Sequence, residues 1–183
     1  MSKSSSTREK LVEAARALFW TRGYSNVSVR DITGSAGVDA ALVSRYFGGK
    51  QGLFEATLAE IAPWEALVAE PDDLLAKAAA SFAHPFDPEA DATNVFTMLV
   101  VNVIDPEMGR MIRDLVQTKM ADPLTERIGS ADARERAALL LAVLFGVALM
   151  RKNFQLGGLA DKSPEQLQAD IIRLGRVALE INS

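Results

Sequence analysis

The feature that most limits the fold is the spacing of the apolar side chains. Between residues 7 and 21 they recur at intervals of three and four residues, which places them on one face of a helix. These positions are Leu11, Ala14, Ala15, Leu18 and Phe19. Similar spacing returns up to residue 181, and no segment alternates apolar and polar residues as a half-buried strand would. We therefore predict an all-α fold.

Three absences in the sequence limit the class of protein. The chain has no cysteine, which excludes disulfides, thiolate nucleophiles and zinc-thiolate sites. The longest apolar run, residues 137–150, is shorter than the roughly 20 residues of a membrane span. We interpret this run as a helix that is buried on every side. The first ten residues lack the apolar core of an export signal, so we expect a cytoplasmic protein with no membrane partner.

Charge is divided unevenly along the chain. Residues 1–55 hold eight basic and five acidic side chains, whereas the remainder holds 12 basic and 19 acidic ones. A basic segment joined to an acidic one suggests that the first third of the chain meets a polyanion.

Residues 28–50 contain the capping and turn residues expected of two short helices joined by a tight turn. Ser28 is a suitable N-cap, with Asp31 three residues later, and Gly37 ends the first helix. Asp39 can cap a second helix over residues 40–47, and Lys50 opens the next one. With a preceding helix that Thr7 can cap, this arrangement predicts a helix-turn-helix unit.

The chain changes character after residue 62. We predict further helices over residues 71–82, 91–103, about 107–127, 130–156 and 164–181. The expected division is a three-helix helix-turn-helix domain at residues 1–62 and a larger helical domain at residues 63–183.

The second helix of the turn has the residue types that a DNA groove requires. Its first residues, Ala40 and Ala41, are small enough for close approach to base edges. Ser44 lies one turn further along the same face, and Arg45 and Tyr46 can reach bases or phosphates. Lys50 stands at a helix N-terminus, which favours an anion such as a DNA phosphate.

Three segments resemble the DNA-binding domain of the tetracycline-repressor (TetR) family of bacterial regulators. They are "AARALFWTRGY", "SVRDITGSAGV" and "RYFGGKQGLF", all within residues 7–62. The resemblance implies a dimeric, all-helical regulator with base and phosphate contacts on aligned residues. Arg45 is added because of its place on the second helix of the turn, and the other residues are those that the resemblance implies. The predicted DNA-contact set is Arg30, Ala40, Ala41, Leu42, Ser44, Arg45, Tyr46 and Lys50.

Three positions depart from the family pattern. Ser44 stands where the family most often has Tyr, so one aromatic contact is missing. Asp39 replaces a usual Ser and adds a negative charge near DNA, and Gly49 replaces a Ser that would cap the following helix.

For the second domain the resemblance implies a pocket for a small effector and a dimer interface formed by two C-terminal helices. The pocket candidates are Phe82, Phe86, Phe96, Met111 and Phe145. The apolar spacing of the last two long helices predicts a seam for a partner helix. The predicted interface residues are Leu141, Leu144, Ala148, Leu167, Ile171, Leu174 and Ala178.

Catalytic and metal chemistry finds little support in the sequence. The only histidine is His84, which leaves no second imidazole or thiolate for a transition-metal site. One histidine in a Pro-rich connection gives no argument for a Ser/His/Asp triad. The "GGK" at residues 48–50 lacks the remaining glycine and the Ser or Thr of a phosphate-binding P-loop. The acidic residues at 87, 89 and 91 lack the spacing of a calcium loop. We expect no enzyme activity, no metal and no cofactor.

The sequence thus predicts a DNA-binding transcriptional regulator, a homodimeric repressor released from a palindromic operator by a small-molecule effector. Two alternatives stay open at this stage. One is a helical ligand-binding protein or small enzyme without a DNA role, and the other is a helical adaptor for another protein.

Overall fold

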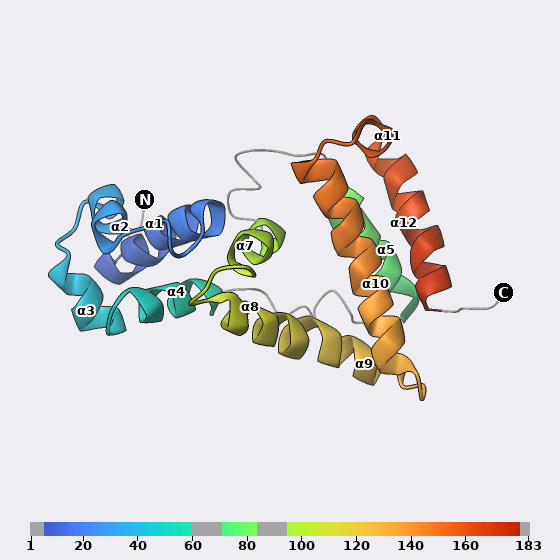
Figure 1. Ribbon diagram of the computed structural model, residues 1–183, viewed down its shortest axis with the longest axis horizontal. Helices are drawn as coiled ribbons and strands as arrows, with labels where there is room; N and C mark the ends of the chain where they lie inside the picture. Colours follow the sequence, from blue (N-terminus) through green and yellow to red (C-terminus); the bar gives the residue numbers. More distant parts are fainter. Residues whose placement is uncertain (1–5, 60–70, 84–94, 180–183) are drawn as a thin grey trace. The chain divides into compact units, whose positions relative to one another are not determined.

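The computed structural model describes residues 6–59, 71–83 and 95–179, and every regular element in these ranges is a helix. The chain divides into two compact units, which are described separately (Figure 1). The first comprises Met1–Ala62 with Pro88–Arg113, and the second comprises Pro63–Asp87 with Asp114–Ser183. The all-α prediction is confirmed over the described residues.

Helix α1 (Thr7–Arg22) is the centre of the first unit. It begins at a capping box in which Ser6 Oγ accepts the N–H of Glu9 and the Glu9 carboxylate accepts the N–H of Ser6. The N-cap is therefore Ser6, and the prediction of Thr7 was wrong by one residue. Its inner face contributes Leu11, Ala15 and Phe19, which are fully buried.

Helices α2 (Val29–Ala36), α3 (Ala41–Phe47) and α4 (Lys50–Leu58) complete the helix-turn-helix region. Helices α2 and α4 pack on α1, and α3 packs on α4. The core between α1 and α4 is an aromatic cluster in which the rings of Phe19, Tyr24 and Phe54 lie 5.4 Å apart, centroid to centroid. This cluster holds α4 against α1, and the N-terminus of α4 directly follows α3.

Helix α7 (Val95–Asn102) also belongs to the first unit, because it packs along α1. Helix α8 (Gly109–Val116) follows, and the boundary between the units falls within it. The first compact unit is thus larger than the predicted domain of residues 1–62. Whether residues 1–62 act alone as the DNA-binding domain stays a prediction.

The second unit contains the remaining helices. They are α5 (Pro71–Ala83), the π-helix η2 (Gln117–Ala121), α9 (Asp122–Ile128), α10 (Ala133–Ala148), the π-helix η3 (Leu149–Asn153), α11 (Gly157–Ala160) and α12 (Pro164–Ala178). Helices α5, α10 and α12 pack against one another. Gly175 permits the close approach, since a Cβ there would lie 2.3 Å from Leu75 Cδ1 and 3.2 Å from Leu140 Cδ1.

The packing of α10 and α12 corrects one prediction and bears on a second, the dimer seam, which stays a prediction. Helix α10 is not buried on every side, because Leu139 is 49% exposed and Ala142 is also exposed. The predicted dimer seam is largely occupied inside the chain. Six of its seven residues are buried there: Leu141, Leu144, Ala148, Leu167, Ile171 and Ala178. The seventh, Leu174, is 43% exposed.

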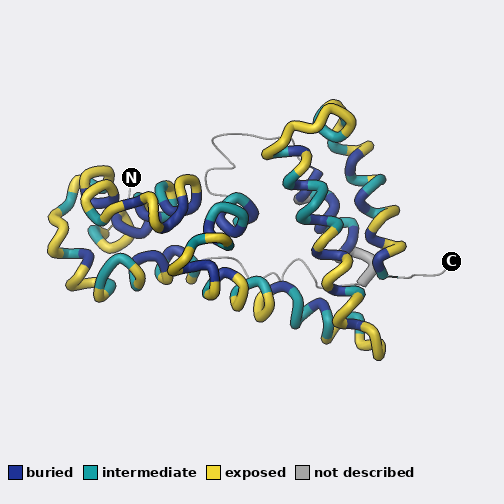
Figure 2. Tube along the Cα trace, viewed as in Figure 1, coloured by how far each residue is buried: buried dark blue, intermediate teal, exposed yellow. Residues whose placement is uncertain are grey.

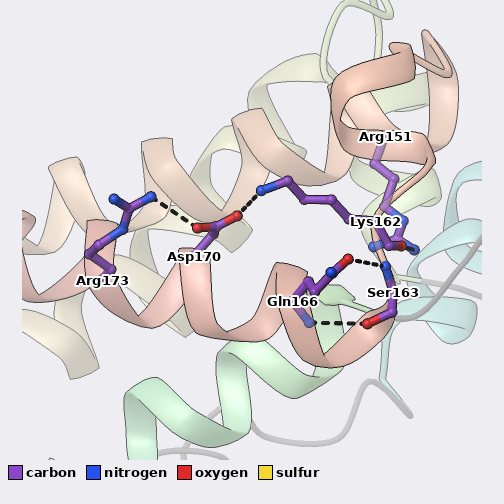
Figure 3. Close-up of polar contacts among 6 residues, drawn as sticks. All are labelled: Arg151, Lys162, Ser163, Gln166, Asp170 and Arg173. Atoms are coloured by element: carbon purple, nitrogen blue, oxygen red, sulfur yellow. Dashed lines mark hydrogen bonds and ion pairs between the residues drawn. The ribbon is translucent and has the colours of Figure 1, made fainter.

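The start of α12 is fixed by polar contacts (Figure 3). Ser163 and Gln166 form a capping box, with Pro164 as the first helical residue, as predicted. Lys162 forms an ion pair with Asp170, which Arg173 also contacts. Hydrogen bonding by Lys162 is the main reason why the pKa of Asp170 lies below its usual value. The buried Arg151 donates to the carbonyl of Lys162, so the connection before α12 is held from both sides.

Within the described residues, no helix has both the length and the apolar character needed to cross a membrane.

Candidate nucleic-acid interface

Helix α2 is capped at both ends, and a further hydrogen bond lies in the turn to α3. Ser28 Oγ accepts the N–H of Asp31, and Asp31 Oδ2 accepts both the N–H and the hydroxyl of Ser28. These hydrogen bonds from Ser28 lower the pKa of Asp31. Gly37 ends α2 in the left-handed conformation, with φ of 66°, which favours glycine. Asp39 Oδ1 then accepts the N–H of Ala41 at 2.7 Å. The N-cap of α3 is nevertheless Ala40, which makes no side-chain capping bond, so the prediction of Asp39 as N-cap was wrong by one residue.

Helix α3 buries one side chain deeply and turns most others to solvent. Val43 is 1% exposed and holds the helix on the core. Much of the remaining surface is exposed (Figure 2). Among the eight residues of the predicted DNA-contact set, Arg30, Ala40, Ala41, Ser44, Arg45 and Tyr46 are exposed, and Leu42 and Lys50 are partly exposed. The fold therefore leaves the predicted contact residues available to a ligand on the outside of α3 and around the start of α4.

The start of α4 is shaped for close packing and for a cation. Gly52 lies so near the end of α3 that a Cβ would be 2.0 Å from the carbonyl oxygen of Phe47. Lys50 Nζ lies 4.0 Å from the centroid of the Tyr24 ring, a cation–π contact that orients the ammonium group. Gly49 provides no side-chain hydrogen bond to the first turn of α4, as expected of a glycine in place of the usual capping Ser.

The basic groups of this surface have no carboxylate partner in the part of the chain that the structure describes. Among the described residues, no carboxylate forms an ion pair with Arg30, Arg45 or Lys50, whereas Arg136 and Lys162 of the second unit are paired. Unpaired cations on an exposed surface remain available to a polyanion.

Helix α7 supports this surface through residues that sequence reasoning missed. Asn102 is fully buried, and its amide oxygen accepts the N–H of Tyr24 at 2.8 Å. Its amide nitrogen donates to the carbonyls of Phe19 and Met98. No local pattern marks this role, because Asn102 and Tyr24 are 78 residues apart.

Asp105 also forms a hydrogen bond to the loop before α2. Its carboxylate accepts the N–H of Ser25 at 3.0 Å and also accepts the N–H groups of Glu107 and Met108. Burial of Asp105 opposes ionisation, but these hydrogen bonds outweigh it and lower its pKa. The loop before α2 is therefore fixed by the corner between α7 and α8.

Of the five predicted pocket residues, two lie in each compact unit and one lies outside the described residues. Phe82 and Phe145 lie in the second unit with ring centroids 6.1 Å apart. Phe96 and Met111 belong to the first unit, and Phe86 lies outside the described residues. His84 and the acidic residues at 87, 89 and 91 also lie outside them. The described part of the chain holds no group of three or more potential metal-ligating side chains.

Comparison with protein families settles the relationship of the chain. A model described as "Bacterial regulatory proteins, tetR family" matches residues 11–57. A second, described as "Tetracyclin repressor-like, C-terminal domain", matches residues 65–174. The chain belongs to the TetR family. The TetR-family N-terminal match covers α2, α3 and the start of α4, which carry the exposed basic surface.

Individual TetR-family relatives agree with this assignment. The chain is 47% identical over 55 residues to the Probable HTH-type transcriptional regulator YttP of Bacillus subtilis. It is 43% identical over 54 residues to the HTH-type transcriptional regulator BetI 2 of Chromohalobacter salexigens. Each match covers 30% of this chain, and they span 27% and 26% of the two relatives, about a quarter of their length.

Solved structures share the fold over nearly the whole chain. A transcriptional regulator from Rhodococcus sp. Rha1 has a TM-score of 0.67 at 23% identity, covering 96% of this chain and 97% of that one. NalD of Pseudomonas aeruginosa, the secondary repressor of the MexAB-OprM multidrug efflux pump, has a TM-score of 0.66 at 20% identity, covering 91% and 95%.

Proposed function

We propose that the chain is a transcriptional regulator that binds DNA through α3 and the start of α4. The observation that supports this most is the exposed outer face of α3, which carries small, hydroxyl, basic and aromatic side chains on a capped helix-turn-helix. In such a unit the second helix enters the major groove, and its first residues meet base edges. Ala41 and Ser44 suit the groove floor, and Arg45 and Lys50 suit phosphates.

Lys50→Ala tests the phosphate contact. We expect weaker binding to every DNA sequence, with the slope of log affinity against log salt falling by about one unit. The measurement is a fluorescence-anisotropy titration of a labelled DNA duplex at several salt concentrations. Lys119→Ala is the matched control, because Lys119 is an exposed lysine of the second unit. A variant with the wild-type slope would remove Lys50 from the interface.

We further propose that the protein acts as a homodimer, through exposed apolar side chains of α10 and α12. Leu139 on α10 and Val177 on α12 are 49% and 71% exposed, and Leu174 is the exposed member of the original seam. Burying these side chains against a second copy is favourable, and a two-fold axis would match a palindromic operator. Because Ile171 is fully buried in its own chain, a charge there would test folding and not assembly.

Replacing Leu174 and Val177 together by Glu is expected to produce monomers, because two carboxylates would be buried at the interface. Sedimentation velocity would measure the mass, with Ala131→Glu, at an exposed residue ahead of α10, as control. A double variant that remains dimeric would place the interface elsewhere.

Regulation is proposed to follow the family pattern. A small effector would bind the second unit, where Phe82 and Phe145 are candidate contacts, and would favour a conformation with lower DNA affinity. The fold shared with NalD, itself a repressor, agrees with repression as the default mode. Regulation of bacterial genes takes place in the cytoplasm, where we expect this protein.

A further inference from the structure

Arg8 lies outside the predicted contact set, yet the fold brings it to the end of α3. It stands in the first turn of α1, and its side chain is exposed. Its guanidinium carbon lies 5.2 Å from the centroid of the Phe47 ring, within the range of a cation–π contact. Phe47 is the last residue of α3 and lies three residues before Lys50.

The position is an unfavourable one for a cation that serves only its own helix. The N-terminal turn of a helix carries partial positive charge and favours acidic side chains. Glu9, the acidic residue of this turn, is engaged in the capping box with Ser6. Among the described residues, no carboxylate forms an ion pair that would compensate the charge of Arg8.

The cation–π contact with Phe47 prepares the guanidinium for a second ligand. A ring beneath the guanidinium carbon takes up none of its N–H donors, so these donors stay open to oxygen ligands. A stacked arginine also loses less conformational freedom when it binds a planar pair of oxygens than a free one would. Phosphate oxygens match this donor geometry.

The residues around Arg8 indicate that the phosphate would be one of the DNA backbone. Phe47 also meets the ring of Tyr46 edge to face, with centroids 6.3 Å apart. Tyr46 is 42% exposed and belongs to the predicted contact set. Arg8 thus adjoins the end of α3 that is proposed to face DNA.

We propose that Arg8 contacts a backbone phosphate of DNA, so that α1 joins α3 and α4 in the interface, and that Phe47 positions its guanidinium. This inference rests on the proposed function and adds a contact from a third helix. The contact is independent of base sequence, because it is made to the backbone.

The experiment compares Arg8→Ala, Arg8→Lys and Lys10→Ala with the wild-type chain. Lys10 is exposed on the same helix, two residues and therefore about 200° further round it. The Lys10→Ala variant thus removes the same charge from a different face of α1. The probe is a labelled duplex of mixed sequence, titrated by anisotropy at several salt concentrations. Thermal unfolding of each variant is measured alongside.

Arg8→Ala is expected to lower affinity about three- to tenfold and to reduce the salt slope by about one unit. Lys10→Ala should leave the slope near the wild-type value. Arg8→Lys should keep the slope but bind more weakly than wild type, because lysine retains the charge without the planar stack. A stabilising role alone would change the melting temperature and leave the slope unaltered.

Phe47→Leu tests the positioning role separately. It should weaken binding in the wild-type background and have little further effect when combined with Arg8→Ala. If the wild-type chain binds with a clear salt slope and Arg8→Ala matches it, the Arg8 contact is overturned and the proposed function stands. If the wild-type chain itself shows no salt-dependent binding, the proposed function fails and this inference fails with it.

Discussion

Ser44→Glu is expected to reduce DNA affinity by about 100-fold or more, because placing like charges face to face costs several kcal/mol. Ser44 is exposed on α3, one helical turn beyond Ala40 and Ala41. If this face enters the major groove, the new carboxylate would lie among base edges and between two phosphate backbones. The loss arises at the interface, so the free energy of unfolding should change by no more than about 0.5 kcal/mol.

Ala17→Glu is the matched control for this experiment. Ala17 is exposed on α1, and the substitution adds the same charge to the same compact unit. Both variants would be titrated against the same duplex, with circular dichroism melts to compare folding. Equal affinities for the two variants would show that α3 does not face DNA.

Asn102→Ala is expected to destabilise the first unit by about 3 kcal/mol. The side chain is fully buried and makes three hydrogen bonds, to the N–H of Tyr24 and to the carbonyls of Phe19 and Met98. Truncation removes these bonds and leaves the buried Tyr24 N–H without its partner. Since Tyr24 also supports Lys50, DNA affinity should fall as well.

Urea titration of the first unit measures this effect. Trp20 is buried there and donates to Thr57 Oγ1 at 3.2 Å, so its fluorescence reports on the packing of α1 against α4. A Trp64→Phe background leaves Trp20 as the only tryptophan. Asn26→Ala is the control, because Asn26 is exposed and donates a single hydrogen bond, to the Arg22 carbonyl. A stability loss no larger than that of the control would remove Asn102 from its supporting role.

The helix-turn-helix could be predicted from sequence because its determinants are local. Ser28 and Gly37 act on groups within a few residues of themselves, and each takes the role that its type predicts. Asp39 also acts locally, on the N–H of Ala41, although the N-cap of α3 is Ala40. The first cap was misplaced because Ser6 and Thr7 are both suitable residues. Only the reciprocal contact with Glu9 distinguishes them.

The predicted seam shows why apolar spacing alone does not identify the partner of a helix. Apolar residues spaced by three and four describe a helix that buries one face, and this spacing is the same whether the partner is another helix of the chain or a second copy. Helix α5 and helix α10 occupy that face of α12, so Leu167 and Ile171 are buried internally. The contact of Asn102 with Tyr24 was beyond prediction for a related reason, since a buried amide has no periodic signature.

Selection from random DNA is the most direct test of the central claim. Purified wild-type protein would be incubated with a random duplex pool at about 0.15 M salt, and the bound fragments sequenced. The account predicts enrichment of a palindrome, which Ser44→Glu fails to enrich under the same conditions. Recovery of fragments with no shared sequence, by a protein whose binding disappears as salt rises, would contradict sequence-specific recognition by α3.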